Sequence, residues 1–386
     1  MRLRVLTLNT WGLPFGLARD LPRRTEALGA TFAESGADVI ALQEVWTTRA
    51  RNRLRAVAAE AGYAHAFYVD RPRGNAGLVV LSRWPFARGE AAHFRVRGRA
   101  ERVHHGDFWA GKGWLDLGLD TPAGPVRLVD THLHAAYGDG SEPDEYTGER
   151  MAQVVELVHG LRDRSSPLVA VGDFNMLEDS EEYAVWRALG GVTDVAAALD
   201  ARRMTVQGGH LYVNDHSDDQ RIDYAFVRDG AEARLRPLAI ERVFDEPIDL
   251  GGREGRYSDH HGLRIDLEIE AGASNTPEAI SGTSDRETAI GLARQRLEEA
   301  AERTEARAGR QTTAGVAGLV VSSAAGFAAD LRTRDRRTLL RVLAFGLPAL
   351  GVVASGMTVT LGSGFTSSAA RRFLDVARLL RDFETG

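Results

Sequence analysis

The chain has 386 residues, which is long enough for one domain of about 250 residues and a smaller second part. Residues 1–270 carry 33 Lys and Arg against 42 Asp and Glu, and the remainder carries 15 against 12, so the two parts have opposite net charge. The acidic main part disfavours binding to duplex DNA through its phosphates, and the absence of cysteine excludes disulfides, thiolate metal ligands and a thiol nucleophile.

Apolar β-rich runs alternate with amphipathic stretches through the first 270 residues. The predicted strands are residues 5–8, 39–42, 78–81, 89–96, 114–119, 126–131, 168–171, 222–227 and 263–269. The predicted helices are residues 23–35, 48–61, 144–162 and 180–189. The runs 78–81 and 89–96 flank a Pro-containing turn, which predicts a hairpin and therefore mixed sheets. The pattern predicts an α/β fold of two packed mixed sheets with helices outside.

The sequence changes character after residue 270. Small, polar residues at 271–284 predict a linker, and the charged run 285–310 predicts a solvated stalk helix. Residues 311–370 predict two apolar helices, followed by a basic helix or tail at 371–386. A thin apolar stripe follows the stalk helix at Ile290, Ala293, Leu297 and Ala301.

The two apolar stretches, 311–329 and 342–370, are uncharged and flank an arginine-rich loop. About 20 residues suffice to span a bilayer as a helix, so we expect a membrane hairpin. Gly318, Ser322 and Gly326 recur at four-residue spacing, which would let the second helix approach closely. A buried soluble hairpin and an interfacial hairpin are the alternatives. Arginines flank both stretches at both ends, so the charge pattern does not orient the hairpin.

Polar residues at the ends of apolar strands form the first part of a candidate site. Asn9 and Glu44 each end such a strand, and a carboxylate beside an amide oxygen suits Mg²⁺, although a glutamate there is more often solvated. Asp173 and Asn175 also follow a strand, and in an extended chain they would lie on one side and hold a phosphate or water. The alternative for this pair is an Asx turn.

Two histidines complete a constellation for phosphodiester chemistry. His132 could polarise the phosphate, and His260 could deprotonate water near neutral pH. Asp223 lies inside a strand, where a carboxylate needs a partner, so we expect it to pair with His260 and set the tautomer of this base. The neighbouring histidines, His134 and His261, point the other way in an extended chain and are expected to be structural or exposed.

Seven segments resemble, in this order, the endonuclease/exonuclease/phosphatase superfamily across residues 1–270: LTLNTWGLP, LQEVW, GLVVLSRWP, THLHA, GDFN, RIDY and SDHHG. Within it, NTWGLP and DFWAGKGWLDL are most similar to neutral sphingomyelinases, whose Asp and Lys five residues apart match Asp107 and Lys112. Lys112 is the only lysine in the chain; without the resemblance, a lysine in a Gly-rich turn would be the preferred interpretation.

The resemblance implies a four-layer α/β sandwich and Mg²⁺-dependent cleavage of a phosphoester by activated water, with Mn²⁺ as a possible substitute. It implies metal ligation by Glu44 and Asn9 with Asp259 adjacent. The roles that it implies for the other groups are phosphate and water binding by Asp173 and Asn175, charge stabilisation by His132, and a His260 base oriented by Asp223.

We therefore expect a membrane-tethered phosphodiesterase that cleaves sphingomyelin or a related phospholipid on the headgroup side. The alternatives are a nuclease or nucleotide phosphodiesterase on the same scaffold, a catalytically dead membrane adaptor and an inositol-phosphate phosphatase. The chain begins without the pattern of a secretory signal. The expected location is a membrane anchor through the C-terminal hairpin with a cytoplasmic catalytic domain, and a soluble cytoplasmic protein is the second choice.

Overall fold

The structure is a computed structural model. It describes residues 1–14, 16–70, 76–102, 105–137, 144–208, 211–213, 219–272, 283–333 and 338–384.

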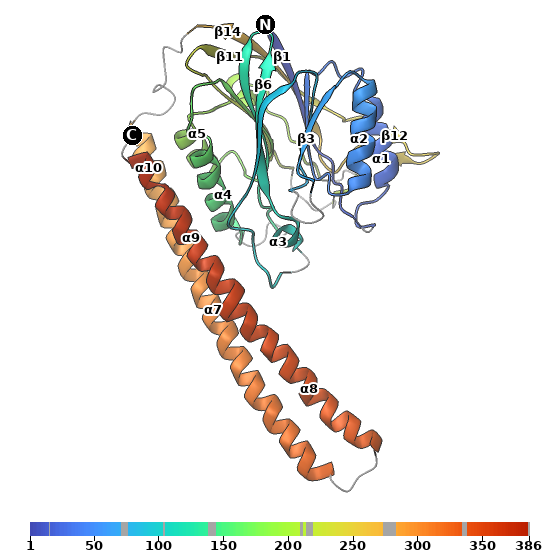
Figure 1. Cartoon of the computed structure of the whole chain (residues 1–386), viewed down its shortest axis with the longest axis vertical. Coiled ribbons are helices and arrows are strands. Elements are labelled where there is room, and N and C mark those ends of the chain that lie inside the picture. The colour runs from blue at the N-terminus through green and yellow to red at the C-terminus, as the bar shows by residue number, and fades with distance from the viewer. Residues whose placement is uncertain are drawn as a thin grey trace.

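Two six-stranded sheets form the centre of the molecule (Figure 1). The first has the order β11-β14-β1-β2-β4-β3, and the second has the order β5-β6-β7-β8-β10-β9. The strands of the first sheet are β1 (Arg2–Asn9), β2 (Val39–Gln43), β3 (His65–Tyr68), β4 (Val79–Ser82), β11 (Ala233–Val243) and β14 (Gly262–Ala271). Those of the second are β5 (Phe86–His93), β6 (Gly113–Thr121), β7 (Gly124–His132), β8 (Leu168–Asp173), β9 (Thr193–Asp194) and β10 (Asp223–Arg228). The short strands β12 (Ile248–Asp249) and β13 (Glu254–Gly255) pair separately.

Both sheets are mixed, as predicted, because β1 pairs with β2 and β7 with β8 in parallel, whereas the other neighbours are antiparallel. The predicted hairpin of residues 78–81 with 89–96 is wrong. β4 and β5 belong to different sheets, and the chain crosses between the sheets at Arg83–Trp84–Pro85. Proline has no N–H to donate to a ladder, so Pro85 ends the pairing in the first sheet, and the next strand, β5, begins at Phe86 in the second sheet.

Helices cover the outer face of each sheet. On the first sheet lie α1 (Leu21–Ala30) and α2 (Thr48–Glu60), and on the second lie α4 (Thr147–Gly160) and α5 (Glu181–Gly190). Two short helices, α3 (Asp107–Ala110) and α6 (Val195–Ala198), lie in connections. One apolar core fills the space between the sheets, and a further core lies under each helical layer. The predicted four-layer sandwich is confirmed.

A helical hairpin follows the sandwich. Helix α7 (Thr283–Thr333) runs out, and the chain returns as α8 (Thr338–Thr360), a π-helical turn (Leu361–Thr366), α9 (Ser367–Leu379) and α10 (Arg381–Glu384). The base of this hairpin packs on α4 and α5, where Ala293 and Leu297 are fully buried. The expectation of a solvated stalk helix is therefore wrong for its apolar stripe, because that stripe extends the core of the second helical layer.

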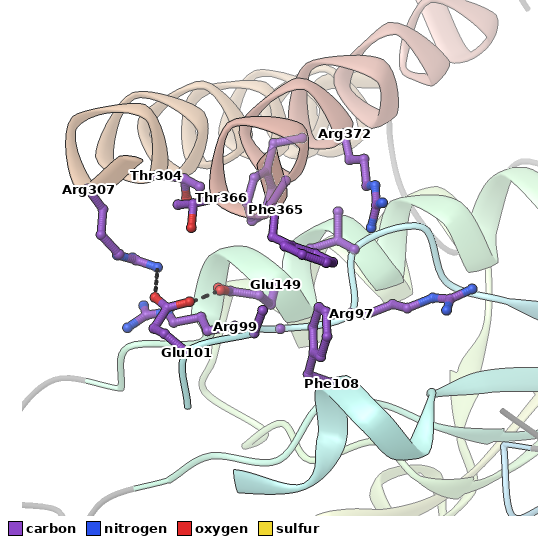
Figure 2. Close-up of a pocket in the computed structure, with 15 residues that line it drawn as sticks. Arg97, Arg99, Glu101, Phe108, Glu149, Thr304, Arg307, Phe365, Thr366 and Arg372 are labelled. Carbon is purple, nitrogen blue, oxygen red and sulfur yellow. Dashed lines mark hydrogen bonds and ion pairs between the residues drawn. The ribbon is translucent and has the colours of Figure 1, made fainter. Parts of the chain in front are cut away.

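A cavity of about 190 Å³ separates the base of the hairpin from the segment before α3 (Figure 2). Arg307 of α7 pairs with Glu101 across it at 3.5 Å, and Phe365 of the π-helical turn meets the ring of Phe108 of α3 edge-on. The hairpin is thus joined to the sandwich by apolar, aromatic and ionic contacts.

The outer half of the hairpin extends away from the sandwich (Figure 1). Ser284–Ala329 and Gly346–Glu384 are long and apolar enough to cross a membrane, judged by length and composition. A Cβ at Gly318 would lie 2.3 Å from Oγ of Ser355, so the helices are in close contact there as predicted. Among the described side chains, the large apolar ones that this half exposes are Val316, Val320, Val321, Phe327, Leu347, Leu350, Val352, Val353 and Met357.

Glu156 of α4 is a buried acid next to the base of the hairpin. Its carboxylate accepts a hydrogen bond from the N–H of Arg95 at 3.0 Å, and Arg372 of α9 donates to the carbonyl of Arg95 at 3.2 Å. Burial raises the pKa of Glu156 from 4.5 to about 7, although the Arg95 N–H opposes this shift. The protonated acid therefore contributes stability below about pH 4.5, and this contribution is lost as the pH rises through about 7.

Glu156→Gln imitates the protonated acid at every pH. We expect the variant to be as stable as the unmodified protein near pH 4.5 and more stable by about 3 kcal/mol near pH 8. Thermal unfolding of both proteins in one detergent at the two pH values measures this difference. The exposed Glu60→Gln serves as the control. An equal difference at both pH values would contradict the assignment of a raised pKa.

Candidate active site

Strand ends from both sheets meet at one edge of the sandwich. His132 ends β7, Asp173 ends β8 and Asp223 begins the antiparallel β10, and the register places these three residues side by side. Asn9 ends β1 of the other sheet, and its Nδ2 donates to Oδ2 of Asp173 at 2.9 Å. The site is therefore built across the two sheets.

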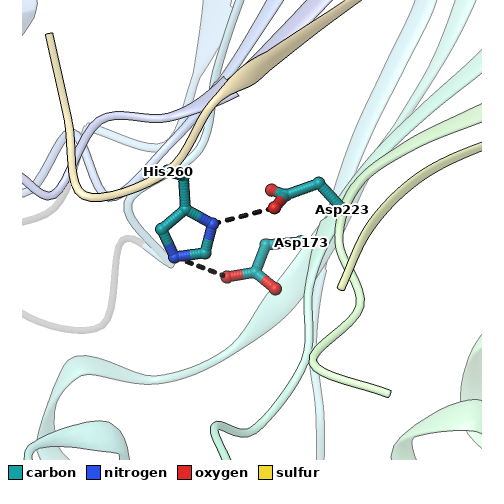
Figure 3. A group of neighbouring side chains, drawn as sticks. All are labelled: Asp173, Asp223 and His260. Atoms are coloured by element: carbon teal, nitrogen blue, oxygen red, sulfur yellow. Dashed lines mark hydrogen bonds and ion pairs between the residues drawn. The ribbon is translucent and has the colours of Figure 1, made fainter. Parts of the chain in front are cut away.

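His260 precedes β14 and contacts two carboxylates of the second sheet (Figure 3). Its Nδ1–H donates to Oδ2 of Asp223 at 2.8 Å, as the sequence predicts, and its Nε2 lies 4.0 Å from Oδ2 of Asp173. Burial alone would lower the pKa of His260, but the charge and hydrogen bond of Asp223 raise it well above the usual value. Thr205 Oγ1 accepts the N–H of Asp223 at 3.2 Å and so helps to hold the strand that carries this partner. The pairing directs Nε2 of His260 toward the other site residues.

Lys112 lies inside the site and is almost fully buried. Its Nζ is 3.1 Å from Oδ1 of Asp107 and 2.6 Å from Nε2 of His132. Asp107 also accepts the N–H of Ala135 and lies 3.4 Å from Nδ1 of His134. The Asp107–Lys112 pair therefore places a compact positive charge against His132.

The charges around Asp173 and Asp107 keep both acids ionised. Burial alone would raise the pKa of Asp173, but His132, with smaller effects from His260 and Lys112, holds it below the usual value. Burial likewise opposes ionisation of Asp107, and Lys112 lowers its pKa. Asp173 also lies 3.2 Å from Nε2 of His132, so it contacts both candidate histidines.

Glu44, Asn9 and Asp259 form the oxygen-rich side of the site. Glu44 follows β2 with a left-handed backbone (φ 59°), and its Oε1 is 3.4 Å from Nδ2 of Asn9. Its Oε2 is buried and has no hydrogen-bond partner among the described residues. Burial raises the pKa of Asp259 to about 6, and the charge of Glu44 adds to this effect.

An orphaned carboxylate oxygen beside crowded acids fits a hard divalent cation. Asp173, Asp223 and His260 also place one possible ligand atom each within 4.8 Å of one another. His260 and Asp223 already satisfy each other, so Glu44 is the better primary ligand. Asn9 directs its amide nitrogen at the acids and accepts the N–H of Trp11 through Oδ1, so its amide would have to rotate to present oxygen to a cation.

The local geometry predicted for Asp173 and Asn175 is wrong. Asn175 has a left-handed backbone (φ 48°), and its N–H donates to Oδ1 of Asp173 at 3.0 Å, which is an Asx turn. The Asp side chain replaces the next ladder contact, so the strand ends and the chain turns. Nδ2 of Asn175 donates to the carbonyl of Leu133, beside His132. Asn175 therefore stays at the edge of the site although the chain there is not extended.

The two neighbouring histidines are structural. His134 is buried and stacks on Tyr146 with ring centroids 4.2 Å apart, and His261 is buried with Nδ1 2.8 Å from Asp245. Neither replaces His132 or His260 in the contacts of the site.

Arg24 of α1 is a supporting residue that the sequence analysis missed. Its guanidinium is buried and donates to the carbonyls of Thr10, Trp11 and Tyr257, which lie in the two segments that carry Asn9 and Asp259. Burial lowers the pKa of Arg24. The Arg-Arg pair in a surface helix gave no sign that one member points inward.

Gly12 fixes the position of Glu44. A Cβ at Gly12 would lie 2.0 Å from the carbonyl oxygen of Glu44, so any side chain would displace this backbone. We expect Gly12→Ala to lower kcat/KM about a hundredfold, because a shift of about 1 Å in a catalytic group has an effect of this size. Gly124→Ala is the control, since its left-handed backbone is strained by alanine but nothing lies within 4 Å of the new Cβ. Equal activity in the two variants would contradict the role of this contact.

Known proteins share both the sequence pattern and the fold. The model of the Endonuclease/Exonuclease/phosphatase family matches residues 6–260. Inositol phosphosphingolipids phospholipase C of Schizosaccharomyces pombe is 32% identical over 69% of this chain and 69% of that protein. A Drosophila melanogaster protein that carries the neutral sphingomyelinase name is 28% identical over 70% of this chain, and the match spans 61% of that relative.

Solved structures with the same fold have low sequence identity. Sphingomyelinase C from Streptomyces griseocarneus has a TM-score of 0.51 and 22% identity over 69% of this chain and 99% of that one. D. rerio TDP2 complexed with single strand DNA product has a TM-score of 0.55 and 20% identity, with the same coverage. At these identities the likeness shows the fold alone. Whether the substrate is a lipid or a nucleic acid has to be argued from the site residues.

Proposed function

Because this chain belongs to the endonuclease/exonuclease/phosphatase family, we propose that it is a Mg²⁺-dependent phosphodiesterase that cleaves a sphingolipid-type phosphodiester and releases the phosphorylated headgroup. The observation that carries this proposal is the buried Asp107–Lys112 pair, with Nζ 2.6 Å from His132. These two residues lie in the segment that resembles neutral sphingomyelinases. The names of the phospholipase and sphingomyelinase relatives support the same substrate class.

The site residues divide into four groups in this proposal. His260 accepts a proton from the attacking water at Nε2 while Asp223 holds its Nδ1–H. Lys112 and His132 donate to phosphate oxygens as negative charge develops. Asp173 holds His132 and Asn9 in place, and with Asn175 it positions the phosphate and water. A cation held by Glu44, Asn9 and Asp259 would supply Lewis-acid polarisation of the phosphate.

The hairpin gives the enzyme its location in this proposal. Its outer half exposes apolar side chains on two helices that satisfy the length and composition of membrane spans. A spanning hairpin would leave the sandwich and α10 on one side of the bilayer and the arginine-rich tip on the other, with the catalytic domain in the cytoplasm.

The test uses the full chain in detergent with sphingomyelin, an inositol phosphosphingolipid and plasmid DNA as separate substrates. Each is incubated with Mg²⁺, with Mn²⁺ or with EDTA. We expect release of a phosphorylated headgroup that requires the divalent cation and is lost in Lys112→Met. DNA cleavage without lipid hydrolysis would reject the proposal in favour of the nuclease alternative. Inactivity on all three, with the cation bound, would support the adaptor alternative.

A further inference from the structure

A second concave surface lies beside the candidate active site. It is a groove of about 690 Å³ between the segment after β1 and the start of α2. Leu13, Pro14, Ala18 and Leu21 line one wall, and Thr47 and Ala50 line the other. The groove is therefore mainly apolar, unlike the charged site next to it.

Both walls of the groove start at residues of the active site. Leu13 follows Asn9 by four positions, and Thr47 follows Glu44 by three. The two segments touch where Gly12 packs on the carbonyl of Glu44. The same two segments therefore carry both the walls of the groove and the residues that would lie against the phosphate, Glu44 and Asn9.

The edge of the groove combines apolar and cationic side chains. Leu17 is 68% exposed, which is high for leucine, and it adjoins the groove residue Ala18. Arg19, Arg49 and Arg53 also line the groove, together with the acids Asp20 and Glu26. Glu26 lies 3.5 Å from Arg53, so Arg19 and Arg49 supply the positive charge that the groove acids do not pair with. Apolar walls with arginines at the edge match a lipid, because the walls can cover hydrocarbon while the guanidinium groups stay near phosphates at the bilayer surface.

The segments that line the groove lie at the end of the sandwich that faces the outer half of the hairpin. β1 runs from the N-terminus, which lies at the far end in Figure 1, toward the end where α3 lies and beyond which the hairpin extends. The segments that line the groove follow the ends of β1 and β2, so they lie at this same end. A bilayer around the outer hairpin would face the groove.

We propose that this groove binds one hydrocarbon chain of the lipid whose phosphodiester is cleaved at the neighbouring site. The proposal rests on the proposed function, since it assumes that the phosphate lies at Glu44. If the groove binds this chain, the length of the hydrocarbon chain contributes to substrate selectivity through its contacts in the groove.

The test uses alkyl phosphocholines from butyl to decyl below their critical micelle concentration, so that each molecule carries one chain and no bilayer is present. If the chain enters the groove, kcat/KM rises about fourfold for each added CH₂ that is buried. In Ala50→Trp the indole occupies part of the groove, and the ratio of kcat/KM for decyl to butyl is expected to fall at least tenfold. Ala56→Trp on the exposed face of α2 is the matched control and should keep the ratio of the unmodified protein.

A second readout separates this proposal from the proposed function. Calorimetry in EDTA measures binding of the same alkyl phosphocholines without cleavage. Binding that strengthens with chain length, and does so less in Ala50→Trp, would support the groove even if no substrate were hydrolysed. An equal chain-length dependence in Ala50→Trp and Ala56→Trp would overturn the groove proposal and leave the proposed function standing. If Ala50→Trp fails to fold, Ala50→Leu replaces it.

Discussion

Replacing His260 with alanine is expected to lower kcat for lipid phosphodiester hydrolysis about a thousandfold. His260 is the histidine whose Nδ1 is held by a buried carboxylate while Nε2 faces the rest of the site. Asp223→Asn should lower kcat about a hundredfold, because an amide can leave the imidazole in the wrong tautomer. Steady-state assays on lipid in detergent micelles, with the cation saturating, measure both effects. Substrate affinity should change little, since neither group is needed to bind the ground state.

His261→Ala provides the comparison within the same segment. His261 is also buried, but its Nδ1 faces Asp245 and not the site. We expect the variant to keep kcat within about threefold, with any loss seen in thermal stability instead. If His261→Ala were as inactive as His260→Ala, the loss would reflect disturbance of the segment before β14, and His260 would no longer be assigned as the base. Double replacement of His260 and Asp223 should cost little more than His260→Ala alone, because the two act as one unit.

The candidate site could be predicted largely because strand periodicity determines where a chain presents polar groups. His132, Asp173 and Asn9 each end a largely apolar, strand-like run, and such runs in a layered α/β fold are buried strands. β7 pairs in parallel with β8, and β1 with β2, so the residues that end these strands lie at the same edge of the sandwich. The roles of these residues came from the resemblance and not from the periodicity.

The errors concern contacts that local pattern does not encode. The segment around Pro85 contains a turn signal, but whether the next strand joins the same sheet depends on the facing layer. The helix at 285–310 has a thin apolar stripe that looks solvated by composition, yet α4 and α5 offer a matching apolar surface. Tertiary packing decided both cases, and neither partner is close in sequence.

The supporting residues were missed for a related reason. Arg24 and Gly12 act through contacts with backbone carbonyls. Every residue has a backbone carbonyl, so the amino-acid sequence does not show which of them is contacted. The Asx turn at Asn175 was considered, but the strand before it favoured an extended chain in the sequence analysis. The structure shows that a strand can end in such a turn and still keep Asp173 in the site.

Glu44→Gln is expected to abolish stabilisation by the divalent cation. The unmodified protein should gain about 2.7 kcal/mol of stability at a cation concentration a hundredfold above its Kd, whereas the variant should gain almost none at the same concentration. Without the cation, the variant should be at least as stable as the unmodified protein. Glu44 places a negative charge close to Asp259, and its carboxylate has a buried oxygen with no partner among the described residues. Removing that charge therefore costs no stability. Thermal unfolding with Mg²⁺ and with EDTA measures both effects without relying on turnover.

The stability of Glu44→Gln relative to the unmodified protein, compared in Mg²⁺ and in EDTA, distinguishes a metal ligand from an acid that only stabilises the fold. Glu60→Gln, an exposed carboxylate at the end of α2, should respond to Mg²⁺ like the unmodified protein. If Glu44→Gln kept the full cation-dependent gain, the cation would be held by other groups, and the cluster of Asp173, Asp223 and His260 would be the next candidate. If Glu44→Gln were less stable than the unmodified protein in EDTA, the Glu44 carboxylate would have partners within the fold. Its buried oxygen would then no longer support the assignment of Glu44 as a metal ligand. Only a loss of cation response together with unchanged or increased stability in EDTA fits a carboxylate that the fold leaves available for a cation.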